Sequence, residues 1–156
     1  MNAKIVEDWL TQILAEHGFV HARRNWYRNN DQTITVVNLD KSPLGGQLYV
    51  NLAASPKEMV GESRPAEHHC HIRVRLESVA QDRELVLRAL DLEKDVATIE
   101  RREVITSAFR SAGLPVLEGF ATLEGIVRII VNHPRAKQFF VRKTLKDDLQ
   151  RRGLMS

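Results

Sequence analysis

The feature that most constrains the fold is a series of short segments with strand character, separated by even shorter turns. Segment 33–39 (TITVVNL) is rich in β-branched residues, and segment 47–53 (QLYVNLA) has an apolar residue at every second position. The connecting stretches 29–31 (NND) and 42–46 (SPLGG) contain residues that favour tight turns. Because such short turns join antiparallel neighbours, the sequence predicts an antiparallel sheet. We expect four strands, at 20–28, 33–39, 47–53 and 68–76.

Helical patterns flank these segments on both sides. In residues 3–17 the apolar side chains recur at helical spacing, Asn2 is a suitable N-cap, and Gly18 stands where helices commonly end in a left-handed residue. Helical spacing returns after residue 78, and we expect further helices at 83–92, 99–112 (ending at Gly113), 122–131 and 134–151. A buried strand is the alternative for 122–131, because that segment also contains a β-branched run.

The order of these elements predicts one α+β domain over residues 1–156. It would have an N-terminal helix, a four-stranded antiparallel sheet and C-terminal helices packed on one sheet face. At 156 residues and 43% hydrophobic composition, the chain is long and apolar enough for a single core. The polar loop 55–67, with two prolines, is long for a connection and is therefore a candidate functional segment.

Charge and cysteine content narrow the classes of function. The formal net charge is only +3, from 23 basic and 20 acidic residues, which is weak support for a nucleic-acid partner. No apolar run approaches the ~18 residues that span a bilayer, and the N-terminus lacks the layout of a secretory signal. A single cysteine cannot form an internal disulfide. We therefore expect a cytoplasmic protein without a membrane segment; the oligomeric state stays open.

The stretch EHHCHIRVRL (67–76) contains three histidines and the only cysteine within four positions. Neighbouring residues of a strand point to opposite faces of the sheet, so this motif would be divided between two sides. Cys70 would share an apolar, helix-facing side with Ile72, Val74 and Leu76. The other side would carry His69, His71, Arg73 and Arg75.

This division argues against two more specific interpretations of the motif. A structural metal site needs about four converging ligands, and His69 with His71 supplies only two unless His21 or Glu67 joins them. A nucleophilic thiol needs exposure and an adjacent base, whereas the neighbours of Cys70 would point away from it and only a distant residue such as His133 could serve. We therefore expect no metal, no cofactor and no catalytic residue.

The remaining interpretation is a polar sheet face used for binding. Arginine, tryptophan and tyrosine are the residue types that most often anchor protein interfaces. A solvated face whose aromatic side chains merely cover the backbone is the equally weighted alternative. The candidate partner-binding residues are Arg23, Arg24, Trp26, Tyr27, Tyr49, Asn51, His69, His71, Arg73 and Arg75.

Several phrases of the sequence, taken together, resemble a known family. They are HGF, a basic strand ending in WYR, TITVVNLDKS, GGQLYVNLAA and CHIRVRLESV. The set is similar to the family called domain of unknown function 4304, with residues 1–95 resembling it and the helical part 96–156 less clearly covered. The match is carried by Tyr49, Asn51, His71, Arg73 and Arg75. The resemblance implies an α+β fold and brings no established activity; small families of this type occur among bacterial immunity proteins, which bind and neutralise a toxin.

Three functions follow as hypotheses. The first is a bacterial protein-binding module of the immunity or antitoxin kind, which needs a specific surface and no catalytic group. The second is binding of single-stranded nucleic acid, in which Arg23, Arg24 and Arg28 interleave with Trp26 and Tyr27. The third is an enzyme acting on an anionic substrate through His71, Arg73 and Tyr49, although no phosphate loop, nucleophile elbow or zinc-protease helix is present in the sequence.

Overall fold

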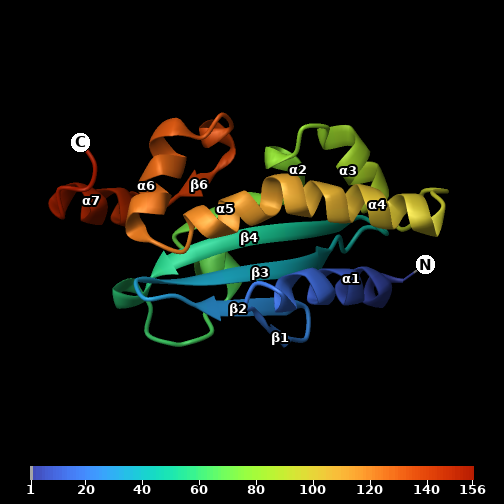
Figure 1. Ribbon diagram of the computed structural model, residues 1–156, viewed down its shortest axis with the longest axis horizontal. Helices are drawn as coiled ribbons and strands as arrows, with labels where there is room; N and C mark the ends of the chain where they lie inside the picture. The colour runs from blue at the N-terminus through green and yellow to red at the C-terminus, as the bar shows by residue number, and fades with distance from the viewer. Residues whose placement is uncertain (1) are drawn as a thin grey trace.

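The computed structural model describes residues 2–156 and contains one antiparallel sheet of six strands in sequential order (Figure 1). The α+β class is confirmed, but the prediction of four strands is wrong. The first predicted strand is divided by a turn at which Arg23 has a φ of 60°, and a short strand from the C-terminal part pairs with β5. The strands are β1 (Val20–Ala22), β2 (Asn25–Asn29), β3 (Thr33–Lys41), β4 (Leu48–Pro56), β5 (Ile72–Arg75) and β6 (Phe140–Val141).

Seven α-helices accompany the sheet in the described residues. Segment 122–131 forms a helix rather than a strand, and Gly113 lies in a π-helical turn, Phe109–Gly113, that continues the chain from α4 into α5. Short 3-10 turns occur at Lys57–Met59, Glu67–His69 and Ala136–Gln138. The helices are α1 (Ala3–Ala15), α2 (Leu76–Val79), α3 (Arg83–Ala89), α4 (Thr98–Ala108), α5 (Leu114–Gly119), α6 (Leu123–Asn132) and α7 (Lys143–Arg151).

The ends of α1 follow the sequence prediction. The Asn2 side chain accepts a hydrogen bond from the backbone N–H of Ile5, and Gly18 adopts a φ of 80° after the helix. The backbone N–H of Phe19 then donates to the Leu14 carbonyl at 3.1 Å. Glycine is suited to this position because a side chain would strain the left-handed conformation.

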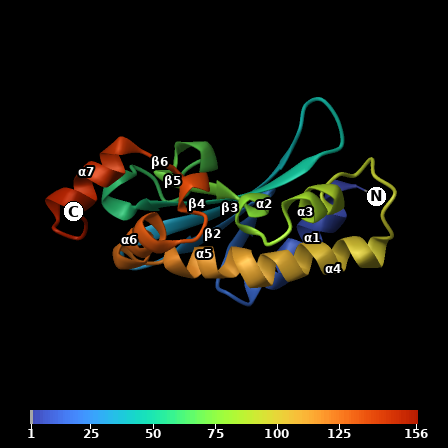
Figure 2. The same ribbon diagram turned by 90° about the horizontal axis from the view of Figure 1, so that it is seen from above.

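The main core lies between one face of the sheet and the helices. Trp26, Val37, Leu52 and Val74 come from four successive strands and point to this face, and all four are buried. The helices α4 and α5 run along the same face (Figure 2). Burying alternate residues of each strand accounts for the period-two pattern in the sequence.

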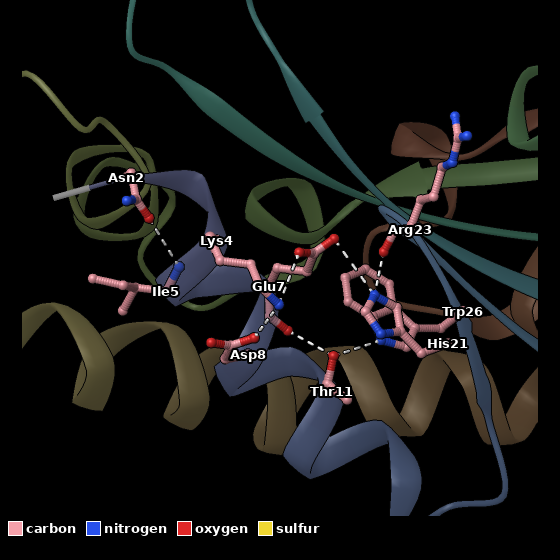
Figure 3. Close-up of polar contacts among 9 residues, drawn as sticks. All are labelled: Asn2, Lys4, Ile5, Glu7, Asp8, Thr11, His21, Arg23 and Trp26. Atoms are coloured by element: carbon pink, nitrogen blue, oxygen red, sulfur yellow. Dashed lines mark hydrogen bonds and ion pairs between the residues drawn. The ribbon is translucent and has the colours of Figure 1, made fainter.

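Polar contacts join α1 to the first hairpin beside this core (Figure 3). Trp26, only 1% exposed, donates its indole N–H to the Thr11 hydroxyl at 3.1 Å, and that hydroxyl donates to the Glu7 carbonyl at 2.8 Å. The His21 ring stacks on Trp26 and hydrogen bonds to the Arg23 carbonyl. Trp26 therefore belongs to the packing of α1 against the sheet, because its indole nitrogen finds its partner on that helix.

A buried arginine that the sequence analysis did not single out stabilises the start of α4. Arg101 donates hydrogen bonds of 2.7 to 2.9 Å to the carbonyls of Ala89, Asp91 and Lys94. One buried guanidinium thus connects α4 to the end of α3 and to the irregular segment after it, and the three carbonyls satisfy its terminal N–H groups.

As for the membrane, none of the helices within residues 2–156 has the length and apolar character needed to cross a bilayer.

Candidate functional site: the second face of the sheet

The face of the sheet opposite α4 and α5 is divided into two unlike parts. Seen from above, segment 57–69 and the tip of the β3–β4 hairpin both rise on this side (Figure 2). Segment 57–69 covers a small second core, which we call the covered half and define as Ile34, Val36, Ala53 and Cys70. The adjoining part, which we call the open half, consists of Asn25, Asn38, Tyr49, Asn51 and Arg75.

Cys70 lies in the covered half, so the prediction that it faces the helices together with Ile72 is wrong. The 3-10 turn Glu67–His69 crosses the second face, and β5 begins only at Ile72, so the strand alternation does not extend back to Cys70. The thiol is fully buried, and burial raises its pKa to about 11. A thiol in this state is protonated at neutral pH and is poorly suited to act as a nucleophile.

A hollow of about 850 Å³ lies over the open half and beside segment 57–69. Its floor is formed by polar side chains of the central strands and its borders by residues of the covering segment, including Arg64 and Glu67. Phe140, on β6, lines the hollow and is 50% exposed. The side chains of the sheet thus leave here a concave surface that is large enough for several side chains of another molecule.

Three asparagines form a hydrogen-bonded row across the floor of the hollow. They stand directly opposite one another on β2, β3 and β4. The amide nitrogen of Asn51 donates to the side-chain oxygen of Asn38 at 3.0 Å, and that of Asn38 donates to Asn25 at 2.9 Å. Arg75 is the next cross-strand neighbour of Asn51 and extends the row onto β5. The row therefore presents amide and guanidinium groups side by side across four strands.

The arginines of the hollow are held in defined positions. Arg73 forms two hydrogen bonds with the Glu67 carboxylate, at 2.7 and 3.3 Å, so its charge is compensated within the chain. The guanidinium of Arg75 lies 3.9 Å from the centre of the Tyr49 ring, and that of Arg64 lies 5.6 Å from the Tyr27 ring. Stacking on an aromatic ring orients a planar guanidinium and leaves its N–H groups free to donate.

The predicted binding residues do not all gather at this hollow. Tyr27, Asn51, His69, Arg73 and Arg75 line it, and Tyr49 lies beneath Arg75 at its border. The other four lie elsewhere: Trp26 in the main core, Arg23 and Arg24 exposed at the β1–β2 turn, and His71 beside Ser55 outside the hollow.

The positions of Trp26 and His71 outside the hollow have simple physical causes. Trp26 and Tyr27 are adjacent on β2 and therefore cannot point to the same face of the sheet. The Nδ1 atom of His71 lies 2.7 Å from the Ser55 hydroxyl oxygen, and burial and the nearby charge of Arg142 lower its pKa. His71 is consequently neutral at neutral pH and its ring is already engaged within the chain.

Sequence reasoning missed several residues of the hollow, including Asn25, Asn38, Glu67 and Phe140 as binding candidates. Strand alternation places Asn25 on the face of Tyr27 and Asn38 on the face of Val36, just as it places Asn51 on the face of Tyr49. The sequence pattern could therefore have identified Asn25 and Asn38. Glu67 and Phe140 carried no such signal, because they come from a 3-10 turn and from a two-residue strand.

Among residues 2–156, no three histidine, cysteine, aspartate or glutamate side chains lie close enough together to hold a metal ion. The His68 and His69 rings are neighbours, with centroids 4.1 Å apart, but no further ligand converges on them in the described part of the chain. The chemistry that the hollow offers is thus hydrogen bonding, charge and aromatic contact.

The fold and the hollow define an α+β domain with helices on one sheet face and a polar concavity on the other. Residues 10–119 match the model of the domain of unknown function family DUF4304, so the chain belongs to that family. The match runs from α1 through α5 and thus extends beyond the part for which the sequence showed a resemblance. No curated protein and no solved structure matches the chain.

Proposed function

We propose that this chain is a non-catalytic binding protein whose hollow receives a segment of a partner protein, in the manner of a bacterial immunity protein or antitoxin. The observation that carries the proposal is the hollow itself, a concavity of about 850 Å³ with the asparagine row as its floor and with Phe140 exposed at its border. Preformed surfaces that combine arginine, aromatic and amide groups are typical of protein interfaces.

The contacts within the chain support a surface that is rigid before a partner arrives. The asparagine row, the Arg73–Glu67 pair and the stacked Arg75 and Tyr49 hold their side chains in place from four different strands and the covering segment. A prearranged surface loses little side-chain entropy on binding, which favours specific and tight association.

Single-stranded nucleic acid is the less favoured partner, because the continuous basic and aromatic patch of that hypothesis is not formed. Trp26 lies in the main core, and Arg28 points to the helix-covered face. There Arg28 hydrogen bonds to the carbonyls of His17 and Leu117. The hollow also contains the carboxylates of Asp40, Glu62 and Glu67, which would repel a phosphate backbone.

The test is calorimetric titration of the chain with the product of the neighbouring gene, which we call the encoded neighbour. Two variants of the chain are compared, each of which removes one exposed apolar side chain. Phe140→Ala changes the hollow, whereas Val131→Ala changes the end of α6 and serves as the matched control. We expect Phe140→Ala to weaken binding about tenfold or more, as for an interface hot spot, and Val131→Ala to have little effect. Failure of the encoded neighbour to bind, or equal effects of both variants, would contradict the proposal.

A further inference from the structure

Arg64 and Arg75 are the two arginines of the hollow without a hydrogen-bonded or ion-paired partner in the described chain, and Arg75 is the more closely stacked on an aromatic ring. Its guanidinium forms no hydrogen bond or ion pair with any residue of 2–156 at the distances that define such contacts, although it is stacked 3.9 Å from the Tyr49 ring centre. Arg73, two residues earlier on the same face, is by contrast neutralised by Glu67. A stacked and unpaired guanidinium presents a planar set of N–H donors that matches the two oxygens of a carboxylate.

The asparagine row provides a second set of groups at the same place. Each amide nitrogen has two N–H bonds, and the row uses one of these on Asn51 and one on Asn38. The side-chain oxygen of Asn51 accepts no hydrogen bond within the described chain. Next to Arg75 there are therefore both donors and an acceptor, which is the combination that the backbone of an extended peptide requires.

The carboxylates of the hollow limit how much negative charge a ligand can carry. Glu67 is compensated by Arg73, which leaves Asp40 and Glu62 to balance Arg64 and Arg75. A single carboxylate placed on Arg75 would be attracted by its stacked guanidinium, whereas a chain of phosphates would also meet Asp40 and Glu62. Because the three carboxylates and the three arginines of the hollow balance one another, a ligand with one acidic group placed on Arg75 and uncharged neighbours meets less repulsion than a ligand with several.

We propose that the hollow recognises one aspartate or glutamate side chain within an extended segment of the partner protein, with the carboxylate on Arg75 and the segment's backbone on the asparagine row. This inference rests on the proposed function and specifies the chemistry of the partner. Arg75 is the residue that reads the charge, and Tyr49 is the residue that positions its guanidinium.

The experiment is an NMR titration of the full chain with two short peptides, acetyl-Gly-Glu-Gly-amide and its glutamine counterpart. We expect the glutamate peptide to shift the Arg75 Nε–Hε resonance and the Asn51 side-chain amide resonances, and the glutamine peptide to leave both unchanged. Arg75→Gln should abolish the shift at Asn51. Arg110→Gln, which removes an exposed arginine of the π-helical turn, is the matched control and should leave the titration intact.

Equal responses to the two peptides, no response to either, or a response of Arg75 to a thymidine dinucleotide but not to the glutamate peptide would overturn the inference. These outcomes are separable from failure of the proposed function. If the encoded neighbour binds through Phe140 while the glutamate peptide has no effect on Arg75, the proposed function holds and the acidic specificity is wrong. If the glutamate peptide shifts the Arg75 resonance but the encoded neighbour does not bind, the hollow recognises a carboxylate and the proposed function is wrong.

Discussion

The covered and the open halves of the second sheet face differ although they share the same strands. On β3, Val36 belongs to the covered half and Asn38, two residues later on the same face, belongs to the open half. On β4 the corresponding pair is Ala53 and Asn51. Apolar residues thus occur where segment 57–69 closes over the sheet, and amide groups occur where the sheet meets the hollow. The difference shows that one strand face can serve both as core and as binding surface.

The largest expected effect is a difference in the free energy of unfolding between a variant in the covered half and a variant in the open half of the same strand, β3. Ile34→Ala in the covered half should lower the free energy of unfolding by ~2–5 kcal/mol, because it leaves a cavity beneath segment 57–69. Asn38→Ala, on the same strand and face, should cost only ~0.5–1.5 kcal/mol for each hydrogen bond that it removes. Urea denaturation of both variants measures the difference, and similar losses would show that the halves are not energetically distinct.

The next largest expected effect concerns the Cys70 thiol in the covered half. Cys70→Ser should lower the free energy of unfolding by ~1–3 kcal/mol, since it places a hydroxyl group among Ile34, Val36 and Ala53. The native thiol should also react slowly with a thiol reagent at neutral pH, because burial raises its pKa to about 11. Labelling is followed by mass spectrometry; rapid labelling of the folded chain would contradict this assignment to the covered half.

A buried acid in the short helix α2, two residues after the end of β5, gives a pH-dependent prediction close to the open half. Glu77 is 1% exposed, and neither of its carboxylate oxygens has a partner within hydrogen-bond distance. Burial raises the pKa of this carboxyl, opposed first by its own backbone N–H and then by the charges of Arg75 and Arg83. In the unfolded chain the group ionises near its ordinary pKa of 4.5, so the stability of the wild type should fall as the pH rises from there through the raised folded pKa.

Glu77→Gln should remove this dependence and raise the free energy of unfolding at pH 7, by about 1.4 kcal/mol for each pH unit by which burial raises the carboxyl pKa, because the neutral amide has no charge to desolvate. At pH 4 the variant and the wild type should differ much less. Thermal denaturation at a series of pH values provides the measurement, with Glu124→Gln, at an exposed position of α6, as the control. Parallel curves for the Glu77 variant and the wild type would rule out the buried charge as the cause.

The smallest expected effect concerns Arg75. Because its side chain is exposed and forms no hydrogen bond or ion pair with residues 2–156, Arg75→Gln should change the free energy of unfolding by no more than ~0.5 kcal/mol. Tyr49→Ala should alter the Arg75 Nε–Hε resonance through loss of the ring beneath it. A large loss of stability in Arg75→Gln would mean that this arginine is structural, and the open half would then resemble the covered half.

The sequence by itself determined the class of fold and the two faces of the central strands. Alternation along a strand is a local property, so the separation of Arg73 and Arg75 from Ile72 and Val74 could be predicted without knowledge of the neighbours. Strand alternation also places Trp26 and Tyr27 on opposite faces of the sheet, so these two residues could not both belong to the candidate surface.

Only the tertiary structure decided which part of the second face is covered. Cys70 reaches the covered half through a 3-10 turn, and Phe140 reaches the hollow through a strand of two residues that lies 65 or more positions from its neighbours on β5. Neither element is long enough to have a periodic pattern of its own. Their positions depend on contacts between segments that are distant in the chain, and such contacts are settled only when the whole core packs.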